Sequence, residues 1–281
     1  MWLATAVGSA LLFGLAGWWM KVSQMRGGLT SVMLFGLYAS GTIGFGIHSA
    51  VEGTWTSFHD YRIWIAGIII GAGSAIGNAL FMKALDYGPA SLTSPLTNMN
   101  IVLVIALGTL VYGEQLQLNE AIGITLLLLA VVLISYKKQE KVSAIERKWF
   151  LYVAAAIVFF TFRNGGLKIT EELGLASAPI LFIGYGLSLL WFMFPLLRPM
   201  NRTAAWTGLK LGLLAGLFSY GGLQLYAAAL ATGPANLAAP IFATNSLVVA
   251  AGAIIVYKEK LNSVQWAAFA CTLAGLIIIR V

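Results

Sequence analysis

Long, unbroken apolar stretches constrain this chain more than any other feature of its sequence. The stretch from Ile122 to Ser135 contains no charged side chain, and similar stretches recur along all 281 residues. Charged residues make up only 10% of the chain, against about 25% in soluble domains. Such a chain cannot cover a water-facing surface, which excludes a soluble enzyme. Continuous rather than alternating hydrophobicity is typical of membrane-spanning helices and not of barrel strands, so we expect an all-α membrane protein.

The length of the chain limits how many helices it can send across a bilayer. Each crossing takes about 20 apolar residues, so ten crossings with short loops use nearly the whole chain. The most polar stretch, 137–148, is predicted to be a charged linker between a first half, 1–136, and a second half, 149–281. The ten predicted transmembrane helices are 2–22, 29–51, 62–84, 89–112, 119–136, 149–169, 176–196, 206–230, 234–257 and 263–279.

The two halves contain an internal repeat. At an offset of 145 residues, the segment 87–92 (YGPASL) matches the segment 232–237 (TGPANL). Shared glycine, proline, asparagine and glutamate positions in register rarely arise by chance in apolar helices. Matches at offsets of 145 and 147 pair Pro95 with Pro240, Asn100 with Asn245, Glu114 with Glu259, Phe13 with Phe160, Lys21 with Lys168, and Tyr38 with Tyr185.

The number of helices in each half predicts how the two copies are oriented. Five is an odd number, so the second copy must enter the membrane from the opposite side. The halves are then inverted five-helix repeats, which is the architecture of alternating-access transporters. Basic residues such as Lys21, Arg26 and Lys148 fall on the side reached after the first helix. By the positive-inside rule this charge distribution places both termini outside the cell.

Two repeated motifs connect the chain to a known family. The fourth and ninth predicted helices begin with GPASLTSP (88–95) and GPANLAAP (233–240), and they end with YGEQL (112–116) and YKEKL (257–261). With these motifs the chain resembles the ten-span EamA-type branch of the drug/metabolite transporter superfamily over its whole length. The resemblance implies transport by two EamA-like repeats, with both termini in the cytoplasm. That orientation is opposite to the one from the charge count, so the orientation stays open.

The resemblance does not specify the substrate. Relatives move amino acids, sugars, nucleotide derivatives, cations and drugs. Small four-span relatives use a membrane-embedded glutamate in the first helix, and the first predicted helix here has none. Its absence argues against simple proton-coupled antiport of cationic drugs.

Polar side chains near the membrane centre are the candidates for substrate binding. Asn100 and Asn245 each lie 11 residues past the proline that opens their helix, or about 16 Å along it, and they face one central cavity if they are related by symmetry. Asn98 is predicted to point elsewhere than Asn100. The alternative for both amides is a hydrogen bond between helices. Arg163 is the strongest charge inside a predicted helix and suits a carboxylate or phosphate; its alternative is snorkelling to the interface near Glu171 or Glu172.

Other candidates have less support from position. They have plain alternatives as hydrogen bonds between helices or as an interfacial aromatic belt. These further substrate-binding candidates are Asn78, Asn164, Tyr220, Gln224 and Trp18.

Repeat-matched prolines and glutamates are the candidates for gating. Pro95 and Pro240 lie inside predicted helices, where each removes a hydrogen-bond donor and can produce either a hinge or a packing kink. Glu114 and Glu259 lie at helix ends, where a cap or loop role is the alternative.

No enzyme motif accompanies these residues. The sequence has no His-Glu-x-x-His, no P-loop and no paired carboxylates within a helix, so we expect no enzyme activity and no cofactor or metal. The predicted function is secondary-active, alternating-access transport of a small organic metabolite across a bacterial inner or plasma membrane, with an amino-acid-like zwitterion or anion favoured by Arg163. Expected partners are this substrate, a coupling proton or ion, and lipid, but no nucleic acid; the oligomeric state stays open. The alternatives are a polyspecific cation or drug exporter, a membrane-embedded lipid-processing enzyme and a passive channel.

Overall fold

The computed structural model describes residues 2–113, 117–136, 147–233 and 235–278, and these residues form helices and connecting turns without a strand. The first half contains α1 (Trp2–Met25), α2 (Thr30–Val51), the short 3-10 helix η1 (Thr54–His59), α3 (Tyr61–Tyr87), α4 (Ala90–Thr97), α5 (Asn100–Tyr112) and α6 (Leu118–Tyr136). The second half contains α7 (Arg147–Glu172), α8 (Ser177–Met193), the 3-10 helix η2 (Phe194–Leu197), α9 (Arg202–Thr232), α10 (Ala235–Ala243), α11 (Asn245–Tyr257) and α12 (Ser263–Ile278).

Two of the predicted helices are interrupted, which the expectation of continuous helices missed. The fourth is divided into α4 and α5 at Asn98 and Met99, and the ninth into α10 and α11 at Thr244. Pro95 lies inside α4 shortly before the first break. A proline removes one helical hydrogen bond and crowds the preceding turn, so it weakens the helix at this point. Pro240 lies within α10, although its side chain, like Glu114 and most of the predicted linker, is outside the described residues.

Within the described residues, seven helices are long and apolar enough to cross a membrane by length and composition, when α4 and α5 count as one and η2 extends α8. The other six candidates are α1, α2, α3, α7, α8 with η2, and α9. Shorter apolar helices lie in 241–257 and 266–275. The chain is therefore helical and built for a membrane, in agreement with its composition.

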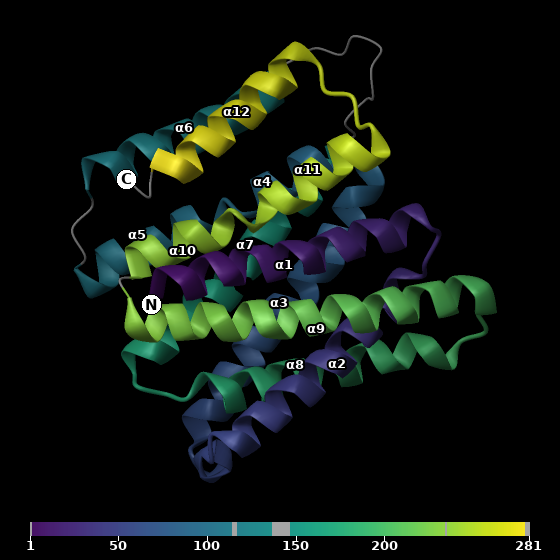
Figure 1. Ribbon diagram of the computed structural model, residues 1–281, viewed down its shortest axis with the longest axis vertical. Coiled ribbons are helices and arrows are strands. Elements are labelled where there is room, and N and C mark those ends of the chain that lie inside the picture. The colour runs from purple at the N-terminus through teal and green to yellow at the C-terminus, as the bar shows by residue number, and fades with distance from the viewer. Residues whose placement is uncertain (1, 114–116, 137–146, 234, 279–281) are drawn as a thin grey trace.

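Contacts at one end of the bundle establish the directions of the helices. The start of α2 meets the start of α9 through the hydrogen bond from the Leu29 amide to the Ala204 carbonyl, at 3.2 Å. Trp149, at the start of α7, donates to Thr93 near the start of α4 at 2.8 Å. Lys21, near the end of α1, pairs with Glu259 just after α11. We call this end, on the right in Figure 1, the Lys21 end.

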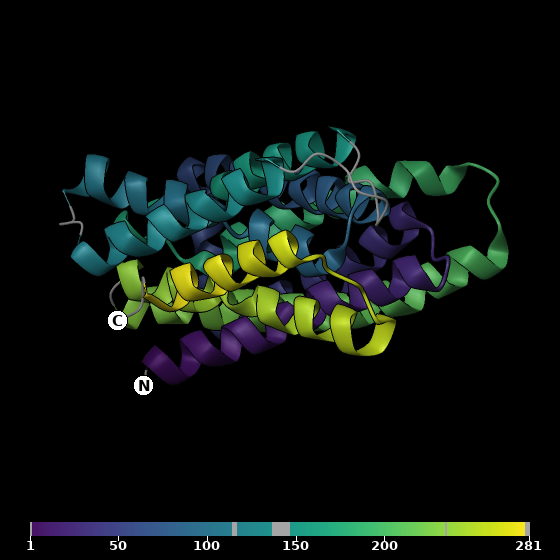
Figure 2. The ribbon, with the colours of Figure 1, turned by 90° about the horizontal axis from the view of Figure 1, so that it is seen from above.

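At the Lys21 end α1 finishes and α7 begins, so these two corresponding helices run in opposite directions. The same holds for the other corresponding pairs, and α1 begins and α12 ends at the opposite end of the bundle (Figure 1). Figure 2 shows that the long helices run lengthwise through the bundle.

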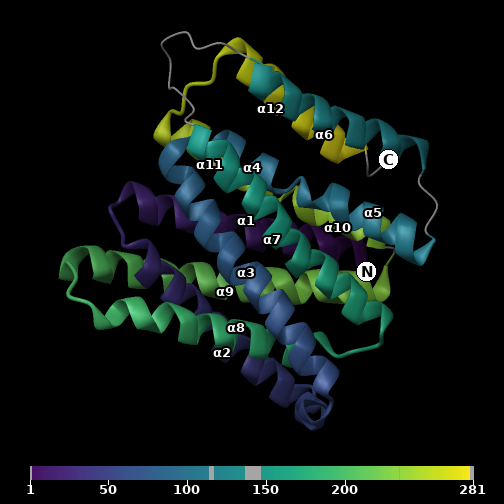
Figure 3. The same cartoon turned by 180° about the vertical axis from the view of Figure 1, so that it is seen from behind.

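Packing follows the same symmetry. α1 packs on α9 as α7 packs on α3, and α2 packs on α9 as α8 packs on α3. α1 and α9 lie on the near face in Figure 1, and Figure 3 shows α3 and α7 on the opposite face. α6 packs on α12, and α2 on α8. Exchanging the helices of the two halves therefore reproduces the main contacts.

Glycines that recur at the 145-residue offset hold these packed helices close: Gly67 and Gly71 of α3 correspond to Gly212 and Gly216 of α9. A Cβ atom added to Gly71 of α3 would lie 2.6 Å from the Cα atom of Gly184 in α8, and one added to Gly212 of α9 would collide with the Met33 carbonyl of α2. Small residues allow such backbone approaches in membrane helices.

We predict that Gly71→Ala lowers the free energy of unfolding by about 1–3 kcal/mol, because the added methyl group forces α3 away from α8. The measurement is thermal unfolding of the purified protein in detergent. Gly186→Ala in α8 is the control, since its added Cβ would meet only Thr42 at 3.8 Å, and alanine is the better helix residue by about 0.5–1 kcal/mol. Equal midpoints for the two variants would contradict the proposed role of Gly71.

Candidate functional site

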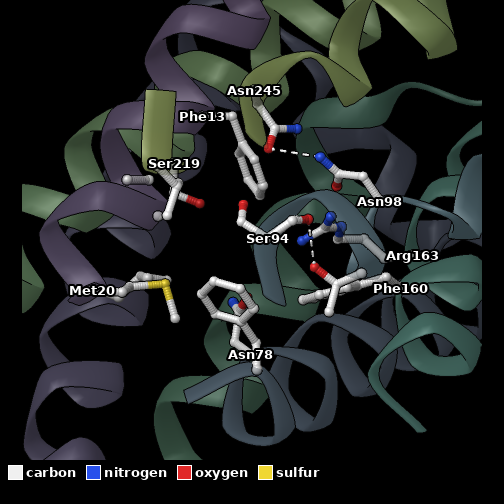
Figure 4. Close-up of a pocket in the computed structure, with 15 residues that line it drawn as sticks. Phe13, Met20, Asn78, Ser94, Asn98, Phe160, Arg163, Ser219 and Asn245 are labelled. Atoms are coloured by element: carbon white, nitrogen blue, oxygen red, sulfur yellow. Dashed lines mark hydrogen bonds between the residues drawn. The ribbon is translucent and has the colours of Figure 1, made fainter. Parts of the chain in front are cut away.

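A cavity lies between the two halves, beside both helix breaks (Figure 4). Its walls come from α1, α2, α3 and α4 of the first half and from α7, α9 and α11 of the second. Its volume is about 30 Å³, which is room for about two water molecules. Of the 15 described residues that line it, Arg163 is the only charged one.

Each helix break is closed by an asparagine from the start of the next helix. Asn100 donates from Nδ2 to the Thr97 carbonyl at 2.7 Å, and Asn245 donates from Nδ2 to the Phe242 carbonyl at 2.7 Å. The acceptors are repeat-matched as well, since Thr97 and Phe242 are also 145 residues apart. A carbonyl released by a helix break needs a donor because lipid provides none.

A third asparagine joins the two breaks across the interface between the halves. Asn98 donates from Nδ2 to the Ala243 carbonyl at 2.6 Å and to the Asn245 Oδ1 atom at 3.1 Å. Asn98 and Asn245 both line the cavity, whereas Asn100 is buried beside it and is not among the lining residues. As predicted, Asn98 and Asn100 point to different places, and Asn98 is the one that reaches the cavity.

Arg163 extends from α7 into this polar centre. Its side chain is buried, with 2% of the residue exposed. The guanidinium carbon lies 4.8 Å from the centroid of Phe13 and 4.5 Å from that of Phe160, which are repeat-matched rings from the two halves. Such contacts stabilise a cation. Arg163 therefore does not reach the interface near Glu172; Lys168 lies near that carboxylate instead, at 3.4 Å.

Asn164 connects Arg163 to the first helix break. The Arg163 Nε atom donates to Asn164 Oδ1 at 3.0 Å, and Asn164 Nδ2 donates to Asn100 Oδ1 at 2.7 Å. Asn164 is not among the residues that line the cavity, so it contacts the cavity residue Arg163 without lining the cavity itself. The conformation of the break and the position of the guanidinium are thus coupled through two amides.

Asn78 lines the cavity at the end of a tyrosine–serine network. It donates from Nδ2 to the Tyr38 hydroxyl at 2.9 Å, and Tyr38 bonds Ser74 at 3.2 Å. The repeat-matched bond joins Tyr185 to Ser219 at 2.7 Å. The two tyrosine rings meet edge to face with centroids 5.0 Å apart. This network fixes the wall that presents Asn78 and Ser219.

Five of the eight predicted binding residues are not among those that line the cavity. Two of them, Asn100 and Asn164, contact lining residues, as described above. The other three are Trp18, Tyr220 and Gln224. Trp18 packs against Tyr257, with ring centroids 5.5 Å apart. Tyr220 and Gln224 both bond to His48: the Tyr220 hydroxyl lies 3.2 Å from His48 Nδ1, and Gln224 Nε2 lies 2.7 Å from His48 Nε2. A direct role in binding stays a prediction for these three.

Glu259 joins three helices at the Lys21 end. Its carboxylate accepts from the backbone amides of Ala90 at 3.1 Å and Ser91 at 3.0 Å, and from the Ser91 hydroxyl at 2.8 Å. It also lies 3.3 Å from the Lys21 ammonium group. Pro89, the N-cap of α4, supplies no side-chain cap, so a carboxylate of the second half caps a helix of the first half.

Sequence reasoning missed several residues of the cavity wall. Ser94 and Thr97 face the cavity because α4 ends there, which the expectation of a continuous helix concealed. Phe13 and Phe160 were noted only as a repeat match; a matched aromatic pair near a buried arginine is the signal that could have identified them.

Comparison with known proteins decides the family. The model of the EamA-like transporter family matches residues 1–136 and 147–281. The chain belongs to the EamA-like transporter family. Its members are integral membrane proteins that transport drugs and metabolites, so a transport role follows for this chain.

Two individual matches cover different shares of the chain. The chain is 34% identical over 76 residues to an uncharacterized protein of Methanocaldococcus jannaschii, a match that covers 27% of this chain and 56% of that protein. The chain thus spans about half the length of this curated relative. A solved crystal structure with 15% identity has the same fold, with a TM-score of 0.62 over 96% of both chains.

We predict that Asn98→Ala lowers the free energy of unfolding by about 1–2 kcal/mol. That exceeds the roughly 0.6 kcal/mol of a typical interhelical hydrogen bond in a membrane, because two bonds are lost at once: Asn245 Oδ1 loses the Asn98 amide, and the Ala243 carbonyl keeps only the Ser246 hydroxyl as its side-chain donor. Thermal unfolding in detergent measures the change. Thr125→Ala, which removes an exposed hydroxyl bonded only to its own helix, is the control, and an equal effect of both variants would count against the bridge.

Proposed function

We propose that this EamA-like transporter is a secondary-active carrier that moves a small organic metabolite by alternating access. In this proposal the chain crosses the membrane ten times as two inverted five-helix repeats, with α4 plus α5 and α10 plus α11 each counting as one crossing. The opposed directions of corresponding helices and their exchanged packing partners support this count. The predicted bounds of the two repeats and of the linker remain part of the proposal.

The observation that carries the proposal is the cavity at the two helix breaks. Discontinuous helices at the interface of inverted repeats form the substrate sites of many secondary transporters. Here both breaks adjoin one cavity, and residues of both halves line it. Two inverted halves can exchange their arrangements, which opens the same cavity to either side in turn.

The surroundings and the energy source follow from the same features. Large apolar residues such as Leu110, Leu118 and Val51 are 79–83% exposed. Lipid of a bacterial inner or plasma membrane is the solvent that suits them. Without a nucleotide-binding motif, the driving force is the gradient of the substrate or of a coupled proton or ion. An amino-acid-like zwitterion or an anion is the favoured cargo.

The Lys21–Glu259 pair is proposed as a gate at the Lys21 end. Lys21 directly follows Met20, which lines the cavity, and Glu259 binds both α1 and α4 from the opposite half. The pair therefore holds the halves together on one side of the cavity. By the repeat, Glu114 and Lys168 are the corresponding residues for the other side, and Glu114 lies outside the described residues.

We predict that the double variant Asn100→Ala/Asn245→Ala loses transport while remaining folded, because both break carbonyls lose their donors and the cavity wall loses its shape. The measurement is saturable flux in proteoliposomes of the compound that most stabilises the wild-type protein in a panel of amino acids, sugars, nucleosides and quaternary amines. Elution as a single monodisperse species establishes folding. Normal flux through a well-folded double variant would refute this site.

We predict that Glu259→Gln opens the Lys21 end. Loss of the ion pair should raise the rate at which a membrane-impermeant thiol reagent modifies Thr97→Cys by at least about fivefold, the low end of coupling energies of about 1–3 kcal/mol. The experiment uses a Cys271→Ser background, since Cys271 is the single native cysteine, with reagent added from the Lys21 side. Glu52→Gln, at the other end of α2, is the control, and an unchanged rate in Glu259→Gln would exclude the gate.

A further inference from the structure

The buried Arg163 side chain has unused hydrogen-bonding capacity at the cavity. Its Nη1 atom is buried and has no hydrogen-bond partner within the described residues. A guanidinium has five N–H donors, and the one donated bond seen in this part of the chain runs from Nε to Asn164. Figure 4 shows the guanidinium nitrogens turned toward the space between Ser94 and Asn98.

The part of the chain that the structure describes provides no counter-ion for the charge of Arg163. Among the described residues, the carboxylates that form ion pairs are Asp60, Glu52, Glu172 and Glu259, and each pairs with a different cation. Arginine stays protonated in proteins, and a buried unpaired charge is costly. The two phenyl rings offset part of this cost through their contacts with the guanidinium carbon, but they accept no conventional hydrogen bond from the in-plane N–H groups.

These observations point to an anionic ligand group. The geometry assigns Arg163 as the anchor of a substrate carboxylate, and this inference rests on the proposed transport function. The carboxylate binds the free N–H edge of the guanidinium, as expected from the match between their planar shapes. Asn164 holds the guanidinium through Nε, so Asn164 acts as a positioning residue.

The remaining walls define the rest of the substrate. Met20, Phe81 and Val249 are apolar residues of the cavity wall, in contrast to the charged Arg163. The amide groups of Asn78 and Asn98 carry oxygens that accept from an amino group, but none of the 15 lining residues is acidic. The site therefore suits the carboxylate group of a small monocarboxylate, with or without a 2-amino group, and it disfavours an organic cation. The cavity has room for about two water molecules in this conformation, so an apolar body beyond the carboxylate requires its walls to move apart.

Matched acid–amide pairs test the anchor on the whole wild-type protein. The probes are acetate with acetamide, 4-methylpentanoate with 4-methylpentanamide, and leucine with leucinamide. Thermal shift and calorimetry in detergent should show at least one acid that binds about tenfold or more tightly than its amide, as expected for a charge-assisted contact. Equal binding of acid and amide in every pair, or no response to any acid, would overturn the inference without any variant.

Two variants separate anchoring from a structural role. Arg163→Met should abolish the preference for the acid while leaving the unliganded midpoint equal or higher, because an unpaired buried charge is removed. Arg163→Lys keeps the charge without the fork and should retain part of the preference. A lower midpoint for both variants with an unchanged acid preference would show that Arg163 serves the fold alone.

Flux distinguishes this inference from the proposed function. Saturable flux of tetraethylammonium or glucose that is independent of Arg163, without acid binding, would leave transport standing and remove the carboxylate anchor. Acid binding that depends on Arg163, without flux of any probe in proteoliposomes, would leave the anchor standing and remove the carrier.

Discussion

A backbone carbonyl inside a membrane must receive a hydrogen bond from the protein itself. This constraint explains the centre of the molecule. The fourth and ninth predicted helices break, and each break releases carbonyls at depth. Asn100 and Asn245 supply the donors from the next helix, and Asn98 supplies one across the interface. The breaks can therefore exist only where these amides converge, and the cavity lies at that point.

The same amides connect the structure of the breaks to the charged group of the cavity. Asn100 accepts from Asn164, and Asn164 accepts from Arg163. A change in the break would move the guanidinium, and a ligand on the guanidinium would act on the break. In the proposed site, two hydrogen bonds therefore link the guanidinium that binds the substrate to the first helix break.

Much of this arrangement is predictable from the sequence, and the limits have physical causes. Low charge and apolar stretches predict a helical membrane protein. The repeat identifies Pro95 and Asn100 as special positions, and Arg163 stands out as a charge inside an apolar helix. The repeat does not reveal that α4 ends at Thr97, because a single proline often only kinks a helix. A continuous helix gives no reason to expect Ser94 and Thr97, at the end of α4, to line a cavity, so the sequence alone does not predict them.

Arg163 has no twin in the other copy, since the repeat pairs it with Ala16, a small residue that also lines the cavity. A carrier made of two identical copies would rest equally in its two end states. One arginine on one side of the pseudo-two-fold axis removes that degeneracy. In the proposed carrier one end state is thus favoured over the other, and the charged group stays with α7 throughout the proposed cycle while the rest of the wall is exchanged.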